Sequence, residues 1–310
     1  MLRNKIADDL NVPIELIDKA LKEAYAKVKL LKQVKKNGSI RLISQPSRNL
    51  KVIQYWLISN IFSKLKIHES ATAYRKGHSV KNNADMHSRN RYFLKLDIKD
   101  FFPSITFNDF MPVLFEWYKT NKQDWPLDSN VENLIKRTCF DKNGRLPIGY
   151  PTSPIISNAV MYNFDSQIVS ELNSNKVKFG NVVYTRYADD FTFSTEKKDS
   201  SNEIYKLIES LMITLKSPKF IINPEKTRFS SSSGGSAFLT GLRICHDGHV
   251  TIHRKYKDHV RLLLSLFKKK ILKPEELVSL MGHISYIKHV DPIFYNKLQR
   301  KYFEILKELR

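Results

Sequence analysis

Two adjacent aspartates, Asp189 and Asp190, interrupt an apolar stretch and have the clearest chemical potential in the chain. Residues 182–187 form a β-branched and aromatic run before them and residues 191–193 continue it, which is typical of a β-hairpin with the acids at its tip. Taken alone, an Asp-Asp pair also fits an ordinary solvated turn. Because like charges repel and resist burial, a pair between two core strands predicts a divalent cation that neutralises it.

A third acid, Asp97, ends the predicted buried strand 92–97. Residues 101–103 form a turn after it and the next helix is predicted only near Asn108, so a helix-capping role is disfavoured. In-line phosphoryl transfer uses two Mg²⁺ ions about 4 Å apart, which activate an attacking hydroxyl and hold the leaving pyrophosphate. Three acids from two neighbouring strands supply ligands for such a pair. The sequence therefore predicts a metal-dependent phosphoryl-transfer site.

Helices and hairpins are predicted around these acids from the spacing of apolar residues and from turn signals. The predicted helices are an N-terminal pair within 4–30, a core helix at 49–66, a short polar helix containing 83–87, helices at 108–120, 129–138, 155–172 and 200–216, and three helices within 255–310. The predicted hairpins turn at Asn37-Gly38, Asp189-Asp190 and Asp247-Gly248.

The composition indicates a globular protein that binds a polyanion. The chain has 310 residues, 42% of them hydrophobic, and its 52 Lys and Arg against 31 Asp and Glu give a net charge of +21 spread along the sequence. Such a charge favours nucleic acid, whereas neither a lipidation signal nor a terminal amphipathic helix points to a membrane. No apolar run approaches ~20 residues, so no membrane span is predicted. Two cysteines and the lack of an apolar leader predict a cytoplasmic location.

Several polar residues have both a structural and a functional interpretation. Lys35, Lys36 and Arg41 cluster on one predicted β-ribbon, either as solubilising side chains or as a clamp on phosphates. His87 on its own is typical of a structural histidine. Ser153 is a fitting N-cap for the helix that follows, and the start of that helix also faces the adjacent strands.

Potential zinc ligands gather near the last predicted hairpin. They are Cys245, His246, His249 and His253. Their spacing matches no zinc finger or ribbon, and strand alternation is expected to project the side chains onto different faces. The sequence therefore does not predict a zinc site here.

In their order along the chain, the motifs resemble those of reverse transcriptases. The matching segments are Asp97 with Phe101-Phe102-Pro103-Ser104, Gly149, Ser153-Pro154 with Ser157-Asn158, Tyr187-Ala188-Asp189-Asp190, Lys226 and Leu239-Thr240-Gly241. The likeness covers about residues 30–250 and is strongest to bacterial retron reverse transcriptases. Residues 83–87 fit the retron Asn-Ala-x-x-His element, and Leu239 stands where retrons commonly have Val before Thr-Gly. Ile148 departs from the family, which usually has Gln there.

The resemblance implies an α+β fold, the right-hand polymerase, with fingers, a palm built on an antiparallel sheet and a helical thumb. The implied boundaries are 1–96 for the N-terminal helices and fingers, 97–245 for the palm with a fingers insertion at about 106–145, and 246–310 for the thumb. The resemblance also implies that Asp97, Asp189 and Asp190 are catalytic. Together with Ile98 they would hold two Mg²⁺ ions, with Mn²⁺ as a substitute.

Further site residues are carried over by position. Phe102 is expected under the sugar of the incoming dNTP, where it would exclude a 2′-hydroxyl. The implied nucleotide-binding residues are Lys35, Lys36, Arg41, Phe102, Gly149, Ser153 and Lys226. The implied RNA-binding residues are Asn83, His87, Thr240 and Gly241.

The implied function is that of an RNA-directed DNA polymerase of a retron. Such an enzyme copies part of a cognate structured non-coding RNA into single-stranded DNA (msDNA), primed from a 2′-hydroxyl of that RNA. The RNA–DNA product is expected to stay bound, and the resemblance further implies anti-phage defence with a separate effector protein. Because the chain stops after the thumb-like helices, removal of the template RNA is expected to need a host RNase H in trans.

Three alternatives stay open. The first is another bacterial reverse transcriptase, from a group II intron, a CRISPR locus or an abortive-infection system; the missing maturase region speaks against the intron. The second is a non-catalytic RNA-binding scaffold with a polymerase fold, which the intact acid triad disfavours. The third is a two-metal nuclease, which would have no use for Phe102.

Overall fold

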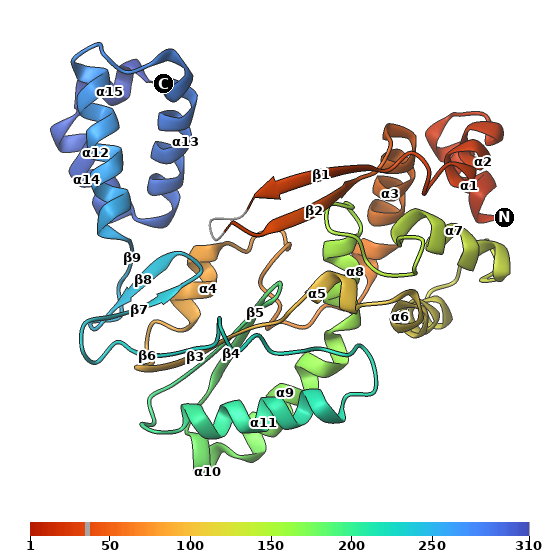
Figure 1. Ribbon diagram of the computed structural model, residues 1–310, viewed down its shortest axis with the longest axis horizontal. Coiled ribbons are helices and arrows are strands. Elements are labelled where there is room, and N and C mark those ends of the chain that lie inside the picture. Colours follow the sequence, from red (N-terminus) through yellow and green to blue (C-terminus); the bar gives the residue numbers. More distant parts are fainter. Residues whose placement is uncertain (35–37, 310) are drawn as a thin grey trace.

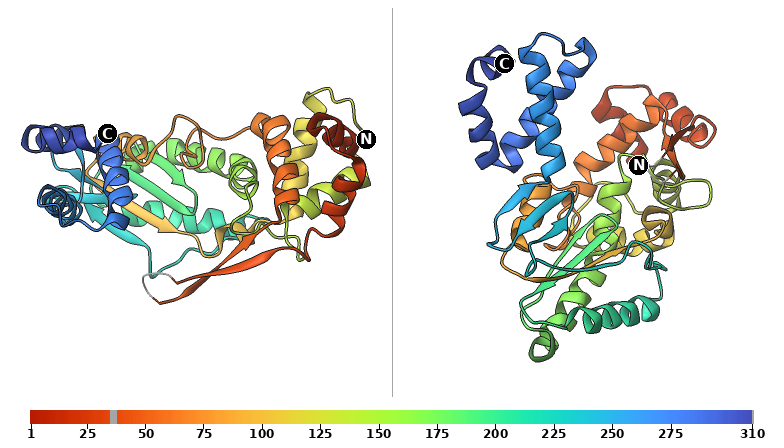
Figure 2. Two further views of the ribbon diagram at one scale, coloured as in Figure 1. Left: turned by 90° about the horizontal axis from the view of Figure 1, so that it is seen from above. Right: turned by 60° about the vertical axis from the view of Figure 1, so that its left-hand side comes forward.

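The computed structural model describes residues 1–34 and 38–309, in which helices pack around three antiparallel sheets (Figure 1). This arrangement confirms the α+β class. None of the described helices combines the length and the apolar character needed to cross a bilayer. Figure 2 shows that the N-terminal helices and the C-terminal helices rise at opposite ends of the central sheet.

Helices form the N-terminal part of the chain, as predicted, and a β-ribbon projects from them (Figure 1). Ile6, Ile17 and Leu57 are buried in the main core where the first three helices meet. Ser47 caps the third helix, because its Oγ accepts a hydrogen bond from Leu50 N at 3.3 Å. The elements of this part are α1 Leu2–Leu10, α2 Ile14–Lys22, β1 Lys29–Val34, β2 Ile40–Gln45, α3 Arg48–Asn60, the 3₁₀ helix Phe62–Lys64, α6 Phe107–Thr120 and α7 Ser129–Cys139.

The central sheet has the strand order β4-β5-β3-β6, with each neighbouring pair antiparallel. Strand alternation sorts its side chains. Leu94, Leu96 and Phe193 are buried in the main core, which α9 and α11 close on one side of the sheet (Figure 1). Lys95 and Asp97 alternate with them on the other face. The elements are β3 Tyr92–Asp97, α5 Phe101–Ser104, α8 Ser153–Val160, α9 Tyr162–Ser174, α10 Lys176–Phe179, β4 Val183–Tyr187, β5 Asp190–Thr195, α11 Ser201–Thr214 and β6 Arg228–Ser231.

A second core joins the third sheet, order β7-β8-β9, to the C-terminal helices and to the short helix α4. Leu242 and Ile252 of the sheet are buried in it with Leu264 and Ile287. The boundary predicted between residues 245 and 246 falls inside this sheet, because β9 ends only at Ile252. The elements are α4 Val80–Met86, β7 Ser236–Leu239, β8 Leu242–Cys245, β9 Val250–Ile252, α12 Arg254–Lys268, α13 Pro274–Val290, α14 Pro292–Lys301 and α15 Phe303–Glu308.

The structure corrects details of the predicted helices. The helix expected at 155–172 is two helices that meet at Met161, and the first begins at Ser153 with Thr152 as its N-cap. Ser153 is therefore not the cap, because its Oγ donates to Pro147 O at 2.7 Å instead. The turn expected at residues 101–103 is the short helix α5, and the last predicted helix divides at Tyr302 into α14 and α15.

Candidate catalytic site

The hairpin predicted to carry the two acids is present between β4 and β5. Tyr187 pairs with Asp190, so Ala188 and Asp189 form a two-residue turn and Asp190 begins β5. Ala188 has φ 59°, a left-handed conformation in which the Cβ atom is strained. Ile98 N donates to Asp189 O at 3.1 Å, which fastens the tip of the hairpin to the end of β3.

Asp97 lies directly opposite Asp190 in the pairing of β3 with β5. Residues paired in this way project from the same face, so the structure brings Asp97 and the hairpin acids to one edge of the central sheet. Asp97 is buried, whereas Asp189 and Asp190 are partly exposed. The three acids thus converge from two strands that are far apart in the sequence.

Two of the three acids have a lysine as counter-ion. Lys226 Nζ lies 2.9 Å from Oδ1 and 2.8 Å from Oδ2 of Asp97, and Asn223 Nδ2 donates to the same Oδ1 at 3.2 Å. Lys95 Nζ lies 3.1 Å from Asp190 Oδ2. Within residues 1–34 and 38–309, the one group of three potential metal ligands with all ligand atoms within 4.8 Å lies elsewhere, at residues 245–249. Asp97 and Asp190 are therefore each paired with a lysine of their own.

The pKa of Asp189 is raised by its surroundings. Burial raises the pKa of its carboxyl, and the charges of Asp190 and Asp97 raise it further. Carboxylate oxygens are the donors that Mg²⁺ prefers, and the ammonium group of Lys226 marks a cation position against Asp97. These acids therefore fit a divalent metal. Ile98 is buried and apolar, so it could contribute only its backbone carbonyl.

An aromatic pair lies beside the acids. Phe102 is half-buried in α5, and its ring centroid is 6.3 Å from that of Tyr74. Partial burial raises the pKa of Tyr74, the charge of Asp189 raises it further, and that of Arg41 lowers it, so the phenol stands near both the hairpin and the ribbon. Nothing in the sequence singles out Tyr74. Its φ of 60°, in a loop near the hairpin acids, is visible only in the structure.

Gly149 is the point where the β-ribbon meets the loop 146–153. It has φ 104°, and a Cβ atom there would lie 2.6 Å from Ser44 O and 2.7 Å from Ile43 Cγ2. Ser44 N donates to Ile148 O at 2.7 Å across the same contact. A side chain at position 149 would therefore push the ribbon away. Ser153 is buried and bonded within the loop, so its side chain does not face a nucleotide in this structure.

We predict that Gly149→Ala lowers the free energy of unfolding by about 2–4 kcal/mol, because it adds a backbone clash to an unfavourable φ. Gly77→Ala is the matched control: Gly77 has φ 80°, and a Cβ atom there would meet no other atom within 4 Å, so strain alone should cost about 1 kcal/mol. Urea unfolding of both variants measures the difference. Equal losses would show that the ribbon contact is not tight.

His87 and Asn83 are both fully buried. His87 Nδ1 lies 2.7 Å from Ser194 Oγ and its Nε2 lies 2.7 Å from Thr185 Oγ1. Asn83 Oδ1 accepts a hydrogen bond from Thr72 Oγ1 at 2.9 Å. The interpretation of His87 as a structural histidine is confirmed. The prediction that these two side chains contact RNA directly is wrong for this structure, because both are enclosed where α4 packs on the rest of the protein.

Stability is predicted to fall in mild acid because of His87. Burial lowers its pKa from 6.5 to about 3, so below the unfolded value of 6.5 the unfolded chain takes up a proton that the folded chain refuses. The loss between about pH 7.5 and about pH 5 should be about 2 kcal/mol. Urea unfolding at both pH values should show this loss in the wild type and in His246→Gln, a control that changes an exposed histidine. His87→Gln should have the same free energy of unfolding at both pH values. If this variant still loses about 2 kcal/mol, His87 is not the cause.

The remaining predicted contacts are divided between two places. Thr240 and Gly241 form the two-residue turn of the β7–β8 hairpin, both with positive φ. Thr240 Oγ1 donates to Val80 O at 3.5 Å, which places this turn beside α4, and Gly241 is exposed. Arg41 is exposed on β2. Lys35 and Lys36 lie outside the described residues.

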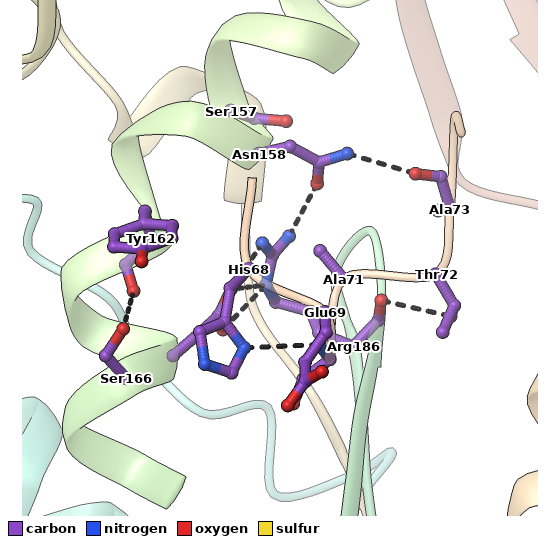
Figure 3. A network of polar contacts seen from close by, with 12 residues as sticks. His68, Glu69, Ala71, Thr72, Ala73, Ser157, Asn158, Tyr162, Ser166 and Arg186 are labelled. Carbon is purple, nitrogen blue, oxygen red and sulfur yellow. Dashed lines mark hydrogen bonds and ion pairs between the residues drawn. The ribbon is translucent and has the colours of Figure 1, made fainter. Parts of the chain in front are cut away.

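A buried polar network that the sequence does not reveal surrounds Arg186, on the strand that leads into the two acids (Figure 3). Arg186 and Asp165 are both fully buried, and Nη2 of the arginine lies 2.7 Å from Oδ2 of the acid. Arg186 Nη1 also donates to Asn158 Oδ1 at 3.0 Å, and Asn158 Nδ2 donates to Ala73 O at 3.0 Å. The strand that leads into the acids is thereby joined to α8, to α9 and to the segment that carries Tyr74.

Comparisons with known proteins show which family this chain resembles. The family described as "Reverse transcriptase (RNA-dependent DNA polymerase)" matches residues 33–273. The Retron Ec73 reverse transcriptase of Escherichia coli is 45% identical over 275 residues, which are 88% of this chain and 86% of that protein. The Retron Ec83 reverse transcriptase of the same species is 33% identical over 283 residues, 89% of this chain and 87% of that protein.

Solved structures resemble the fold. An apo telomerase from Candida tropicalis has a TM-score of 0.54 at 14% sequence identity and covers 92% of this chain. A telomerase from Candida albicans, in complex with a fragment of telomeric RNA, has a TM-score of 0.50 at 13% identity and covers 91%. The chain spans 58% of the length of each of these two proteins, and at such low identity the likeness concerns the fold alone.

Proposed function

The chain belongs to the reverse transcriptase family, and from that premise we propose that it copies part of a cognate structured RNA into single-stranded DNA, starting from a 2′-hydroxyl of that RNA. It is an RNA-directed DNA polymerase of the retron type with the right-hand polymerase fold. The observation that carries the proposal is the position of Asp97 opposite Asp190, beside the Asp189 turn. A primer end and a nucleotide would meet at this edge of the sheet.

The enzyme depends on a divalent metal, as its family does, and we infer that the metal is Mg²⁺, with Mn²⁺ as a substitute. Asp97, Asp189 and Asp190 would hold two ions, with the carbonyl of Ile98 as a further ligand. When bound, the ions supply charge neutralisation for the attacking hydroxyl and the leaving pyrophosphate. Lys226 would then release Asp97 and be free to support the primer end, because its side chain is 54% exposed.

The incoming dNTP is proposed to lie between the acids and the β-ribbon. Arg41 on β2, with Lys35 and Lys36, would contact the triphosphate, and residues 149–153 would line the nucleotide mainly through their backbone. Phe102 would face the sugar. Its ring is held in place by Phe101, whose centroid is 5.6 Å away, and by Tyr74. A braced ring at that position would leave no room for a 2′-hydroxyl.

Phe102→Ala is therefore expected to reduce discrimination against ribonucleotides by about tenfold to a hundredfold. The measurement is the ratio of kcat/KM for dTTP and UTP on poly(rA) with an oligo(dT) primer. Phe115→Ala removes an exposed phenylalanine of α6 and serves as the control. If Phe102→Ala keeps the wild-type ratio, Phe102 does not select between deoxyribose and ribose.

The RNA is proposed to contact the surface around Thr240 and Gly241, next to α4. Asn83 and His87 would act indirectly: His87 joins the end of α4 to β4 and β5 of the central sheet, and Asn83 joins α4 to Thr72. The RNA–DNA product would stay bound, a host RNase H would remove template RNA in trans, and a separate effector protein would act with the complex in anti-phage defence. We place these steps in the cytoplasm.

The direct test of the polymerase is incorporation of labelled dTTP on poly(rA) with oligo(dT) and Mg²⁺. We expect extension of the primer that requires both template and nucleotide. A non-catalytic scaffold would bind the RNA without extending the primer. A two-metal nuclease would shorten labelled DNA without any nucleotide, and either result would overturn the proposal.

A further inference from the structure

The turn between β8 and β9 brings together three side chains of different ligand chemistry. Cys245, Asp247 and His249 each offer one ligand atom, and the three atoms lie within 4.8 Å of one another. Among residues 1–34 and 38–309, no other three potential metal ligands have their ligand atoms this close together. It lies on the third sheet, whereas the catalytic acids belong to the central sheet.

The hairpin pairing explains why the three converge. Cys245 N donates to His249 O at 3.0 Å, and the β8–β9 register continues from Ile244 opposite Val250, so Cys245 and His249 are opposite neighbours on one face. Asp247 bends back over the turn: its Oδ1 lies 2.6 Å from His249 Nδ1 and accepts from His249 N at 3.2 Å. The strand alternation that was expected to separate these side chains stops at the turn.

The neighbouring histidines do not belong to the group. His246 lies in the same turn and its side chain is exposed, while its backbone N donates to Gly235 O. His253 caps α12, because its Nδ1 accepts from Lys255 N at 3.1 Å. The ligand set is therefore one thiolate, one imidazole and one carboxylate, which differs from the four residues considered from the sequence.

We propose that Cys245, Asp247 and His249 form a site for one borderline-soft transition-metal ion of the Zn²⁺ class. Zinc takes thiolate sulfur, imidazole nitrogen and carboxylate oxygen at about 2.0–2.3 Å, which puts ligand atoms about 3.5 Å apart. A spread of 4.8 Å closes to that separation by small rotations of side chains that are exposed or only half-buried. Three protein ligands leave the fourth tetrahedral position to water.

The hairpin is anchored well enough to present these ligands. A Cβ atom at Gly248, in the middle of the turn, would lie 3.0 Å from Ser88 O, so the turn rests against the chain just after α4. Ile244 next to the site is fully buried in the second core. The ligands therefore stand on a fixed strand end, and a bound ion would fasten the two strands to the turn between them.

Thiol protection tests the site without relying on polymerase activity. The full chain, freed of metal and kept in excess Mg²⁺ to engage the catalytic carboxylates, is treated with N-ethylmaleimide, with and without equimolar Zn²⁺. Modification of the Cys245 peptide is followed by mass spectrometry. Bound zinc should slow it about tenfold or more, because the free thiolate is the reacting species. Cys139 is fully buried and should stay unmodified, which reports an intact fold.

Variants of the turn separate a built site from general zinc binding. His249→Ala and Asp247→Ala keep the thiol but remove a ligand, so zinc protection should disappear in both. His246→Ala is the matched control in the same turn and should keep it. A lack of protection in the wild type would overturn the proposal. So would equal protection in His249→Ala, or a loss of protection in His246→Ala as large as in His249→Ala.

Discussion

Asp189→Asn is expected to lower DNA synthesis by roughly a thousandfold or more, the equivalent of about 4 kcal/mol in the barrier. Asparagine keeps the size of the side chain but removes the charge that a metal pair needs. Synthesis on poly(rA) with oligo(dT) measures the loss. Asp8→Asn, which removes an exposed acid of α1, should leave the rate unchanged. Wild-type synthesis by Asp189→Asn would remove this acid from the catalytic site.

The same substitution should leave the fold at least as stable as the wild type. Burial and the charges of Asp190 and Asp97 already raise the pKa of Asp189, so a neutral side chain relieves repulsion. RNA binding should be retained, because one negative charge is lost and none is added. Urea unfolding and filter binding of RNA check these two expectations. A drop in both would indicate a misfolded variant and not a catalytic defect.

Arg186→Met is expected to lower the free energy of unfolding by about 3–5 kcal/mol. Asp165 would be left charged, fully buried and without its ion partner, although Tyr184 Oη would still donate to it at 2.8 Å. Urea unfolding measures the loss. Lys206→Met breaks an exposed ion pair with Glu203 and should cost less than about 0.5 kcal/mol. A similar loss in both variants would mean that the buried ion pair contributes no more to stability than the exposed one.

A double variant separates charge burial from packing. Arg186→Met with Asp165→Asn removes both charges, so it should be more stable than Arg186→Met alone. Additive losses would contradict a direct coupling between the two residues. Arg186 also donates to Asn158, which in turn donates to Ala73 O. Both variants lack Arg186, so the segment that carries Tyr74 should be less firmly held in each of them, including the double variant that regains stability.

The hairpin with the two acids and its distant partner Asp97 could be predicted because their signals are local. An apolar run broken by two acids indicates a hairpin, and a buried strand that ends in an acid indicates a ligand. Each signal lies within about ten residues. The apolar alternation of the two strands restricts how they can pair, and the observed register sets Asp97 opposite Asp190.

The buried network could not be predicted, because its pattern is not local. Arg186 in an apolar strand is compatible with a solvated position, and only Asp165, from a helix earlier in the chain, makes its burial possible. His87 poses the same problem. Its partners Ser194 and Thr185 come from strands β5 and β4, so the short polar helix alone does not reveal whether the histidine faces RNA or the core.

For the proposed nucleotide site, the structure adds contacts that the sequence does not reveal. Gly149 was expected to line the nucleotide, and the structure adds its contact with Ser44 and Ile43 of the ribbon. That contact depends on two segments separated by about a hundred residues of sequence, which no turn signal encodes. Tyr74 was missed for the same reason, because its neighbours Phe102 and Asp189 come from other elements.

The most direct measurement concerns the nucleic acid that copurifies with the chain from its native cells. We expect single-stranded DNA joined to RNA through a 2′–5′ branch, detected by its release with a debranching enzyme. The branched product should be missing when Asp189→Asn replaces the wild type, while the RNA alone remains bound. Recovery of only linear RNA with the wild-type chain would contradict priming from a 2′-hydroxyl and with it the proposed function.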